Sequence, residues 1–118
     1  MKKAGMLAVS VMVVLVALSA IAVGANKNAP VSRTLTGQVM DHSGNPVSDA
    51  IVYLKDTKTL AVKSYITSKD GAFRFPALSP NIDYEVYAQV GGHRSDTKTL
   101  SSFDSRAQAV INLKIDTR

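Results

Sequence analysis

The sequence predicts an all-β domain, a seven-stranded antiparallel β-sandwich, on three observations. Short stretches that alternate between apolar and polar residues recur along the chain, which is typical of strands with one buried face. Glycine, proline, asparagine and aspartate separate these stretches as turn formers. No sustained helical period follows Val23. Seven short strands without crossover helices favour two packed sheets in a Greek-key order, and a barrel is the alternative.

The first 25 residues are expected to form a signal helix that is removed on export. Lys2-Lys3 is a short positive region, and an uncharged apolar run follows from Met6 to Val23. Val23-Gly24-Ala25 supplies the small residues of a cleavage site, so we expect the mature chain to begin at Asn26. The chain is then secreted, periplasmic or held in the cell envelope. The competing interpretation is a retained membrane anchor, since the run approaches the roughly 18 residues that span a bilayer.

Composition narrows the classes of function. Removing 25 of the 118 residues leaves 93, which suits one domain, and the basic count falls from 14 to 12 against 9 acidic residues. The basic residues form no run, so the charge pattern gives no indication of nucleic-acid binding. The chain has no cysteine, which excludes disulfides, thiol nucleophiles, thiolate metal sites and a lipid-bearing cysteine.

Residues 34–40 are expected to form the first strand, after a polar tether at residues 26–33. Leu35, Gly37 and Val39 share one face of this strand, and polar residues occupy the other. Gly37 is expected to let a neighbouring backbone approach closely, because it carries no Cβ atom.

Turn formers at residues 41–46 separate the first strand from a second at residues 50–55. Its inward residues are Ala50, Val52 and Leu54. A third strand is expected at residues 60–67, and it is weaker because two polar residues dilute its apolar face.

Asp70-Gly71 is the strongest turn signal, because tight hairpin turns need positive φ angles. The chain is expected to reverse there in a β-hairpin. Phe73 and Phe75 then share one face of a fourth strand, residues 72–75, and are expected to enter the core together. Pro76 is expected to end that strand because it removes a backbone donor.

Three further strands complete the predicted sandwich. Residues 84–90 alternate cleanly until a pair of glycines follows. Residues 94–100 are polar and are expected to form an edge strand. The loop at residues 101–106 is expected to anchor itself through Phe103. Residues 107–115 then place five apolar residues on one face.

These patterns resemble the carboxypeptidase regulatory-like domains, a branch of the transthyretin-like sandwiches with a carbohydrate-binding-like fold. A first block matches the family at Gly37, Gly44, Pro46, Ala50 and Val52. A second block matches it at Thr67, Gly71, Phe73, Phe75, Leu78, Pro80 and Tyr84. The loop from Pro80 to Tyr84 is one residue longer than the family pattern and lacks its glycine, although asparagine is able to take the left-handed conformation that glycine would supply. The resemblance implies architecture, and an accessory module of the kind attached to secreted peptidases, glycan-active enzymes and surface receptors.

The sequence predicts no enzyme, no cofactor and no metal. His42 and His93 are the only histidines, and their spacing is not that of metal ligands. Four loop residues with side-chain oxygens are expected to cap turns rather than bind calcium. They are Asp41, Asn45, Asp49 and Asp83. A small transthyretin-like hydrolase is the alternative, and it would need a cleft that gathers both histidines with Arg94.

Three tyrosines are the candidate ligand-binding residues. If Val52, Ile66 and Ala88 point inward, strand alternation places Tyr53, Tyr65 and Tyr87 on outer faces, where rings can stack on sugars or on a partner. Ordinary cross-strand packing also explains such tyrosines. The leading function is therefore a non-catalytic module that acts by binding a glycan or a protein, or by structural association, at or beyond the envelope, with carbohydrate binding as one form. The alternative within that class is association through the expected edge strand at residues 94–100.

Overall fold

The computed structural model describes residues 32–118, which lie within one compact unit, Val31–Arg118. The predicted signal helix and most of the predicted tether lie outside these residues. The described part of the chain is all-β, as predicted, and none of it forms a helix long and apolar enough to cross a membrane. Its strands are β1 (Arg33–Asp41), β2 (Ile51–Asp56), β3 (Val62–Ile66), β4 (Ala72–Leu78), β5 (Tyr84–Val90), β6 (His93–Arg94), β7 (Lys98–Leu100), β8 (Gln108–Val110) and β9 (Leu113–Ile115).

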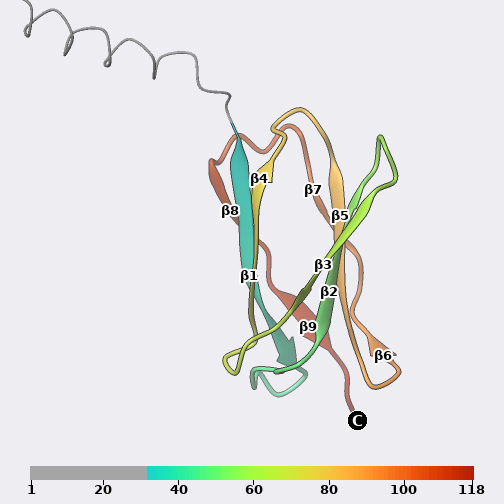
Figure 1. The fold of residues 1–118 in the computed structure, drawn as a ribbon. Helices are drawn as coiled ribbons and strands as arrows, with labels where there is room; N and C mark the ends of the chain where they lie inside the picture. The colour runs from blue at the N-terminus through green and yellow to red at the C-terminus, as the bar shows by residue number, and fades with distance from the viewer. Residues whose placement is uncertain (1–31) are drawn as a thin grey trace, which may run out of the picture. The chain divides into compact units, whose positions relative to one another are not determined.

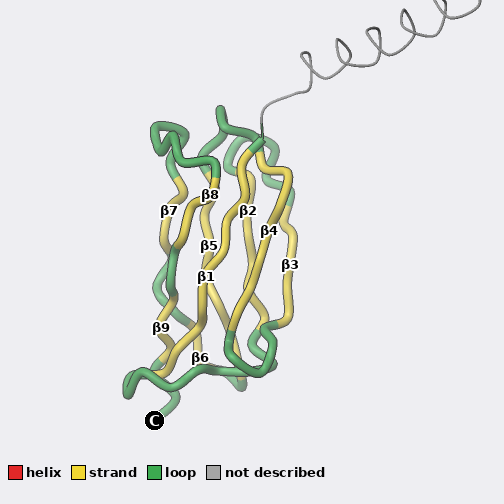
Figure 2. The backbone as a smooth tube through the Cα atoms, turned by 90° about the vertical axis from the view of Figure 1, so that its left-hand side faces the viewer, coloured by secondary structure: helices red, strands yellow, loops and turns green. Residues whose placement is uncertain are grey.

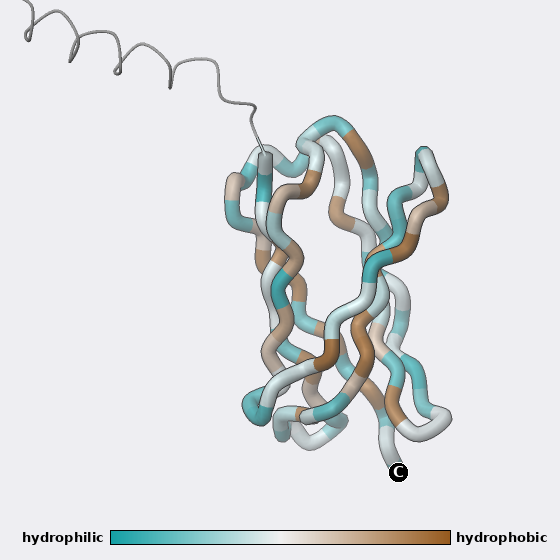
Figure 3. The backbone as a smooth tube through the Cα atoms, in the orientation of Figure 1, coloured by the Kyte–Doolittle hydropathy of each residue, from teal (hydrophilic) through white to brown (hydrophobic). Residues whose placement is uncertain are grey.

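Two sheets face each other across the core (Figure 1). One sheet has the order β4-β1-β8, with β9 also paired to β1. The other has the order β3-β2-β5-β6, with β7 also paired to β5. Figure 1 shows the two sheets edge-on, and Figure 2, turned by 90°, shows them face-on. Apolar and polar residues alternate along the strands (Figure 3), so each sheet turns one apolar face inward. The buried apolar residues are Leu35, Val39, Ala50, Val52, Leu54, Phe73, Phe75, Leu78, Tyr84, Val86, Ala88, Leu100, Ala109, Leu113 and Ile115.

The described residues form nine strands, not seven, because two predicted strands are each broken by a polar side chain. Between β6 and β7 the hydroxyl of Ser95 accepts the Ala88 N–H at 2.8 Å, in place of a ladder carbonyl. Between β8 and β9 the side-chain oxygen of Asn112 accepts the Gln38 N–H at 3.0 Å. The expectation of purely antiparallel pairing was also wrong, since β8 and β9 both run parallel to β1.

The turn at Asp70-Gly71 exists, but it is not a hairpin between paired strands. Gly71 has φ of 75°, as predicted. However, β3 and β4 on its two sides belong to different sheets. The Gly71 carbonyl accepts the Val39 N–H at 2.8 Å, so the turn is fixed to β1 and directs the chain across the sandwich.

Strand β4 continues through Pro76 to Leu78, which corrects its predicted end. The register against β1 shifts there, because Pro76 and Ala77 together lie opposite Thr34. This is a β-bulge, and Ala77 takes a φ of 61°. Proline is tolerated because β4 is an edge strand.

The family-pattern residues lie in the core and its turns. Phe73 and Phe75 are buried with ring centroids 6.1 Å apart, as predicted. A Cβ atom on Gly37 would lie 1.8 Å from the Ile111 carbonyl oxygen, so the close approach expected there is confirmed. The buried Thr67 hydroxyl accepts the Ala50 N–H and donates to the Val47 carbonyl. Asn81 is not among the residues with positive φ, so the loop does not use the left-handed conformation that asparagine could supply there.

Arg33 was expected in the tether, but it begins β1 and is 3% exposed. Its guanidinium donates to the carbonyls of Ser79 and Ile82 in the β4–β5 loop. It also donates to Ser101 and Asp104 in the β7–β8 loop. These four bonds fix both loops to β1. The expected anchor of the second loop, Phe103, is instead 95% exposed.

Candidate functional site

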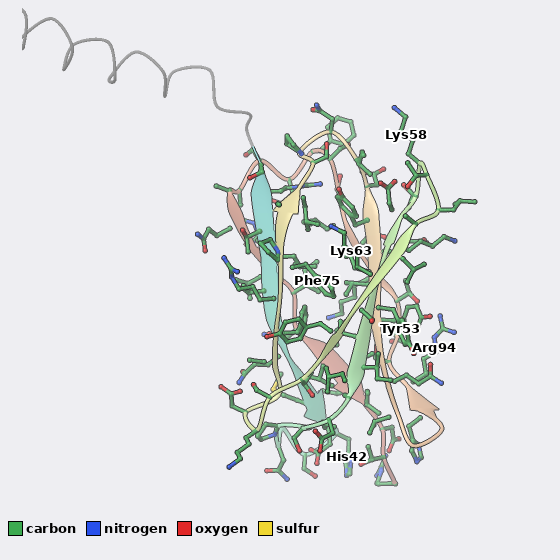
Figure 4. All side chains as sticks on the ribbon, viewed as in Figure 1. His42, Tyr53, Lys58, Lys63, Phe75 and Arg94 are labelled. Atoms are coloured by element: carbon green, nitrogen blue, oxygen red, sulfur yellow. The ribbon has the colours of Figure 1, made fainter. Side chains whose placement is uncertain are left out.

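The candidate site is the outer face of the sheet formed by β3, β2, β5, β6 and β7, called here the tyrosine face. Tyr53 in β2 lies directly opposite Tyr87 in β5 and Ser64 in β3. Its neighbours Val52 and Leu54 are buried, so strand alternation turns the two tyrosines away from the core. Figure 4 shows Phe75 between the sheets, with Tyr53 and Arg94 on the far side of the five-stranded sheet.

Tyr53, Tyr87 and Arg94 form one stack across three strands. The Tyr53 and Tyr87 rings are stacked with centroids 5.1 Å apart. The Arg94 guanidinium carbon lies 3.8 Å from the Tyr87 ring centroid, which is a cation–π contact. Tyr87 is therefore in contact with a side chain from each of the two strands that flank β5.

Tyr65 does not belong to this face, and its predicted placement was wrong. It lies opposite Val52, so the two side chains share the inner side of the sheet. Its ring packs edge-on against Phe75, with centroids 6.0 Å apart, at the open edge of the core. Ile66, which was expected to point inward, is 65% exposed and lies opposite Ile51 on the tyrosine face.

Exposed aliphatic residues surround the stack on the side of β3. Ile51 is 36% exposed, Val62 56% and Ile66 65%. Single exposed apolar residues are normal, but several adjoining ones on one face indicate an interaction surface. Ile51 lies directly opposite Ile66, whereas Val62 lies four residues along β3, opposite Lys55, with Ser64 and Tyr53 between them.

The charges on the tyrosine face are few. Lys55 and Glu85 lie directly opposite each other, and Arg94 adds one cation. The ion pairs among residues 32–118 are Arg106–Asp104 and Arg118–Asp116, and neither lies on this face. The tyrosine face therefore combines apolar and aromatic surface with one guanidinium that has no acidic partner in the described part of the chain.

The two larger of three hollows found among the described residues lie away from this face. The larger, of about 550 Å³, covers the outer face of the other sheet beside Val110 and Arg74. Two of its polar side chains are already bonded: Gln38 donates to the Asp70 carbonyl, and Asn112 accepts from Gln38. The second, of about 300 Å³, lies beside Arg33, whose guanidinium is satisfied by four carbonyls. In the larger hollow the Arg74 guanidinium forms no hydrogen bond or ion pair within residues 32–118.

The carboxylates act as turn caps and ion-pair partners. Asp41 accepts the N–H groups of Asn45 and Ser43, and these bonds, led by the one from Asn45, lower its pKa. The Arg106 guanidinium lowers the pKa of Asp104 to about 2, and Arg118 does the same for Asp116. Within residues 32–118 no three His, Asp or Glu side chains are grouped to hold a metal ion.

The fold and the buried pattern residues define a β-sandwich module of the transthyretin-like class. A sequence model of the carboxypeptidase regulatory-like domain matches residues 34–115. The chain belongs to this family, as its sequence motifs predicted. A search of curated proteins finds no match.

Solved structures share this fold at low sequence identity. The dioxygenase domain of a carbohydrate-binding fusion protein from Streptomyces sp. SirexAA-E is 17% identical, with a TM-score of 0.56, over 79% of this chain and 84% of that one. The 3-chlorocatechol 1,2-dioxygenase of Rhodococcus opacus is 12% identical, with a TM-score of 0.59, over 77% and 62%. A form of the major pilin subunit of Bacillus cereus is 10% identical, with a TM-score of 0.61, over 75% and 31%.

These structures correct the prediction that the chain is not an enzyme. That prediction relied on a resemblance to accessory modules, yet catechol and hydroxyquinol dioxygenases contain the same sandwich. The architecture therefore does not separate enzymes from binding modules. At these sequence identities the similarity shows the fold alone, and the activity of those enzymes is not assigned to this chain.

Sequence reasoning identified two members of the stack and missed the third. Arg94 was considered for a hydrolytic cleft with the histidines and as the start of an edge strand, but not for the tyrosine face. Its position opposite Gln89, two residues from Tyr87, places it on the tyrosine face. Strand alternation could have found it if β6 had been aligned with β5.

Proposed function

We propose that this chain is an exported binding module that associates with a protein partner through the tyrosine face. The observation that carries the proposal is that exposed aliphatic residues lie on the same face as the Tyr53–Tyr87–Arg94 stack, with the Ile51–Ile66 pair on one side of Tyr53 and Val62 on the other. Tyrosine and arginine are enriched at the centres of protein interfaces, where they provide most of the binding energy. Export is proposed from the Lys2-Lys3 region and the apolar run that follows it.

The geometry of the stack favours a protein over a glycan. Sugars stack on open ring surfaces, but the Tyr87 ring already contacts both Tyr53 and Arg94. The aliphatic residues around the stack are suited to contact with apolar side chains. A pilin of B. cereus and a pilus backbone protein of group B streptococcus have related folds, which supports a role in structural association at the level of the fold.

A parallel binding screen tests the proposal. Residues Val31–Arg118 form one compact unit, so a chain beginning at Asn26 can be screened against a random peptide library and a glycan array. We expect peptides with alternating apolar residues to bind. Tyr53→Ala is then expected to weaken binding by about 1 kcal/mol or more, roughly fivefold or more.

The outer face of the other sheet provides a matched control. Val110 is 54% exposed there, close to the 56% of Val62. Val62→Ser should weaken peptide binding, whereas Val110→Ser should not. Binding that is confined to glycans, or an equal effect of the two serine variants, would overturn the proposal.

A further inference from the structure

Strand β3 is the continuous exposed edge of the described sheets. It pairs with β2 and with no other described strand, and all five of its residues are exposed. The other edges are interrupted: β4 contains Pro76 and a bulge, while the edges formed by β6 with β7 and by β8 with β9 are each broken. Such interruptions prevent strand pairing, and β3 has none.

Half of the backbone groups of β3 point away from β2. The Ala61 carbonyl accepts the Asp56 N–H, and the Thr67 N–H donates to the Ala50 carbonyl, so both residues face β2. Direction alternates along an antiparallel ladder, which turns Val62, Ser64 and Ile66 toward the open edge. These three residues offer three N–H donors and three carbonyl acceptors to an added strand.

We propose that β3 pairs with β3 of a second copy of this chain, antiparallel, with the two-fold axis at Ser64. This inference rests on the proposed function, because it names the protein partner and extends the tyrosine face. In this register Val62 of each copy lies opposite Ile66 of the other, and Lys63 lies opposite Tyr65. Each copy therefore meets an identical surface, as a two-fold interface requires.

The side chains select this register over its neighbours. An axis at Lys63 would place two lysines opposite each other, and like charges directly opposite are destabilising. An axis at Tyr65 would leave Val62 opposite Ser68, beyond the end of the strand. The axis at Ser64 forms two aliphatic pairs and two lysine–tyrosine pairs. The charge of Lys63 disfavours pairing of β3 with unrelated strands. In the proposed register Lys63 lies opposite the Tyr65 ring of the second copy, where a cation–π contact can form.

Pairing joins the two tyrosine faces into one. Val62 and Ile66 point to the same side of the sheet as Tyr53 and Ile51. The second copy thus adds its own Val62 and Ile66 to the aliphatic border of the first. The joined surface is wider than the face of either copy alone, and both copies contribute to it.

Cysteine cross-linking tests the register directly, because the chain has no cysteine of its own. In a hydrogen-bonded antiparallel pair the Cα atoms are about 5.5 Å apart. This lies within the range that a disulfide spans. The Ser64→Cys chain is expected to form a disulfide-linked dimer under mild oxidation, and the Val110→Cys control is not. Faster linking by Tyr65→Cys than by Ser64→Cys would overturn the proposed register.

Sedimentation of the cysteine-free chain, begun at Asn26, tests the dimer itself. Ser64→Pro removes an N–H that faces the open edge, so it should raise the dimer dissociation constant about tenfold or more while leaving the monomer folded. A parent chain that stays monomeric at about 1 mM would overturn the inference, since this excludes even weak pairing. The inference would also be overturned if the parent chain forms no dimer and Ser64→Pro nevertheless loses peptide binding. In that case the partner of β3 would be an extended peptide and not a second copy of the chain. Tyr53→Ala should reduce peptide binding but not Ser64→Cys cross-linking, so the two proposals fail separately.

Discussion

Replacing Arg33 by methionine tests whether one buried cation holds the loop end of the sandwich together. The guanidinium donates from Nε, from Nη1 twice and from Nη2 to four carbonyls, at 2.7 to 3.2 Å. Its planar fork of five N–H donors suits several acceptors at once, which a lysine ammonium does not match. Methionine retains an apolar stem and removes every donor.

The expected loss follows from the carbonyls that remain. A hydrogen bond to a charged group contributes about 1.5–3 kcal/mol, and a buried acceptor left unpaired costs about 1–3 kcal/mol. Water can enter the hollow of about 300 Å³ beside Arg33 and satisfy part of this set. We therefore expect Arg33→Met to lower the free energy of unfolding by about 3–5 kcal/mol, well below the sum of four separate bonds. Arg33→Lys should lose about half as much.

Urea denaturation followed by circular dichroism measures this change. The control is Arg74→Met, since Arg74 is exposed on β4. Proteolysis should also cleave the β7–β8 loop of Arg33→Met faster, because its anchor is absent. A loss below about 1 kcal/mol, no larger than an ordinary surface substitution, would refute the reasoning.

Three further predictions concern the core, the acid limb and processing. Phe75→Ala should destabilise the domain by about 3–5 kcal/mol in the same assay, and a loss below about 1 kcal/mol would place the ring outside the core. The pKa of Asp104 is lowered to about 2 in the folded chain, against about 3.9 when unfolded. The ionised Asp104 carboxylate therefore stabilises the fold above about pH 4, and this stabilisation is lost as the pH falls toward 2. Plots of unfolding free energy against pH for the parent and for Asp104→Asn should converge in acid. Plots that stay parallel would contradict this prediction. Intact-mass analysis of exported protein should find a chain that begins at Asn26, whereas full-length chain recovered only from membranes would favour the anchor.

The sequence was sufficient for the class of fold because burial there follows a simple alternation. Phe73 and Phe75 share a strand face and are both buried. Strand breaks were not predictable, since they depend on tertiary hydrogen bonds such as those of Ser95 and Asn112. Arg33 lies two residues before Leu35, so strand alternation places its side chain on the same inner face. This was not predicted, because a charged residue is not expected in the core. A buried arginine becomes predictable only when the carbonyls of distant loops are known.

The misplaced Tyr65 shows how one buried polar residue decides which face of a strand is apolar. Hydropathy favours Ile66 as the inward residue of β3, yet Ile66 is 65% exposed while Thr67 is 3% exposed. The Thr67 hydroxyl bonds two backbone groups between Val47 and Ala50, so burying it satisfies polar groups that burying Ile66 would leave unpaired. Because side chains alternate with a period of two, Thr67 inward forces Tyr65 inward and Ile66 outward. The exposed aliphatic border of the tyrosine face is therefore a consequence of the Thr67 hydrogen bonds. Thr67→Val, which keeps the shape but removes the hydroxyl, should destabilise this arrangement by about 1–3 kcal/mol in urea denaturation, whereas an unchanged stability would mean that the Thr67 hydrogen bonds do not decide which face is buried.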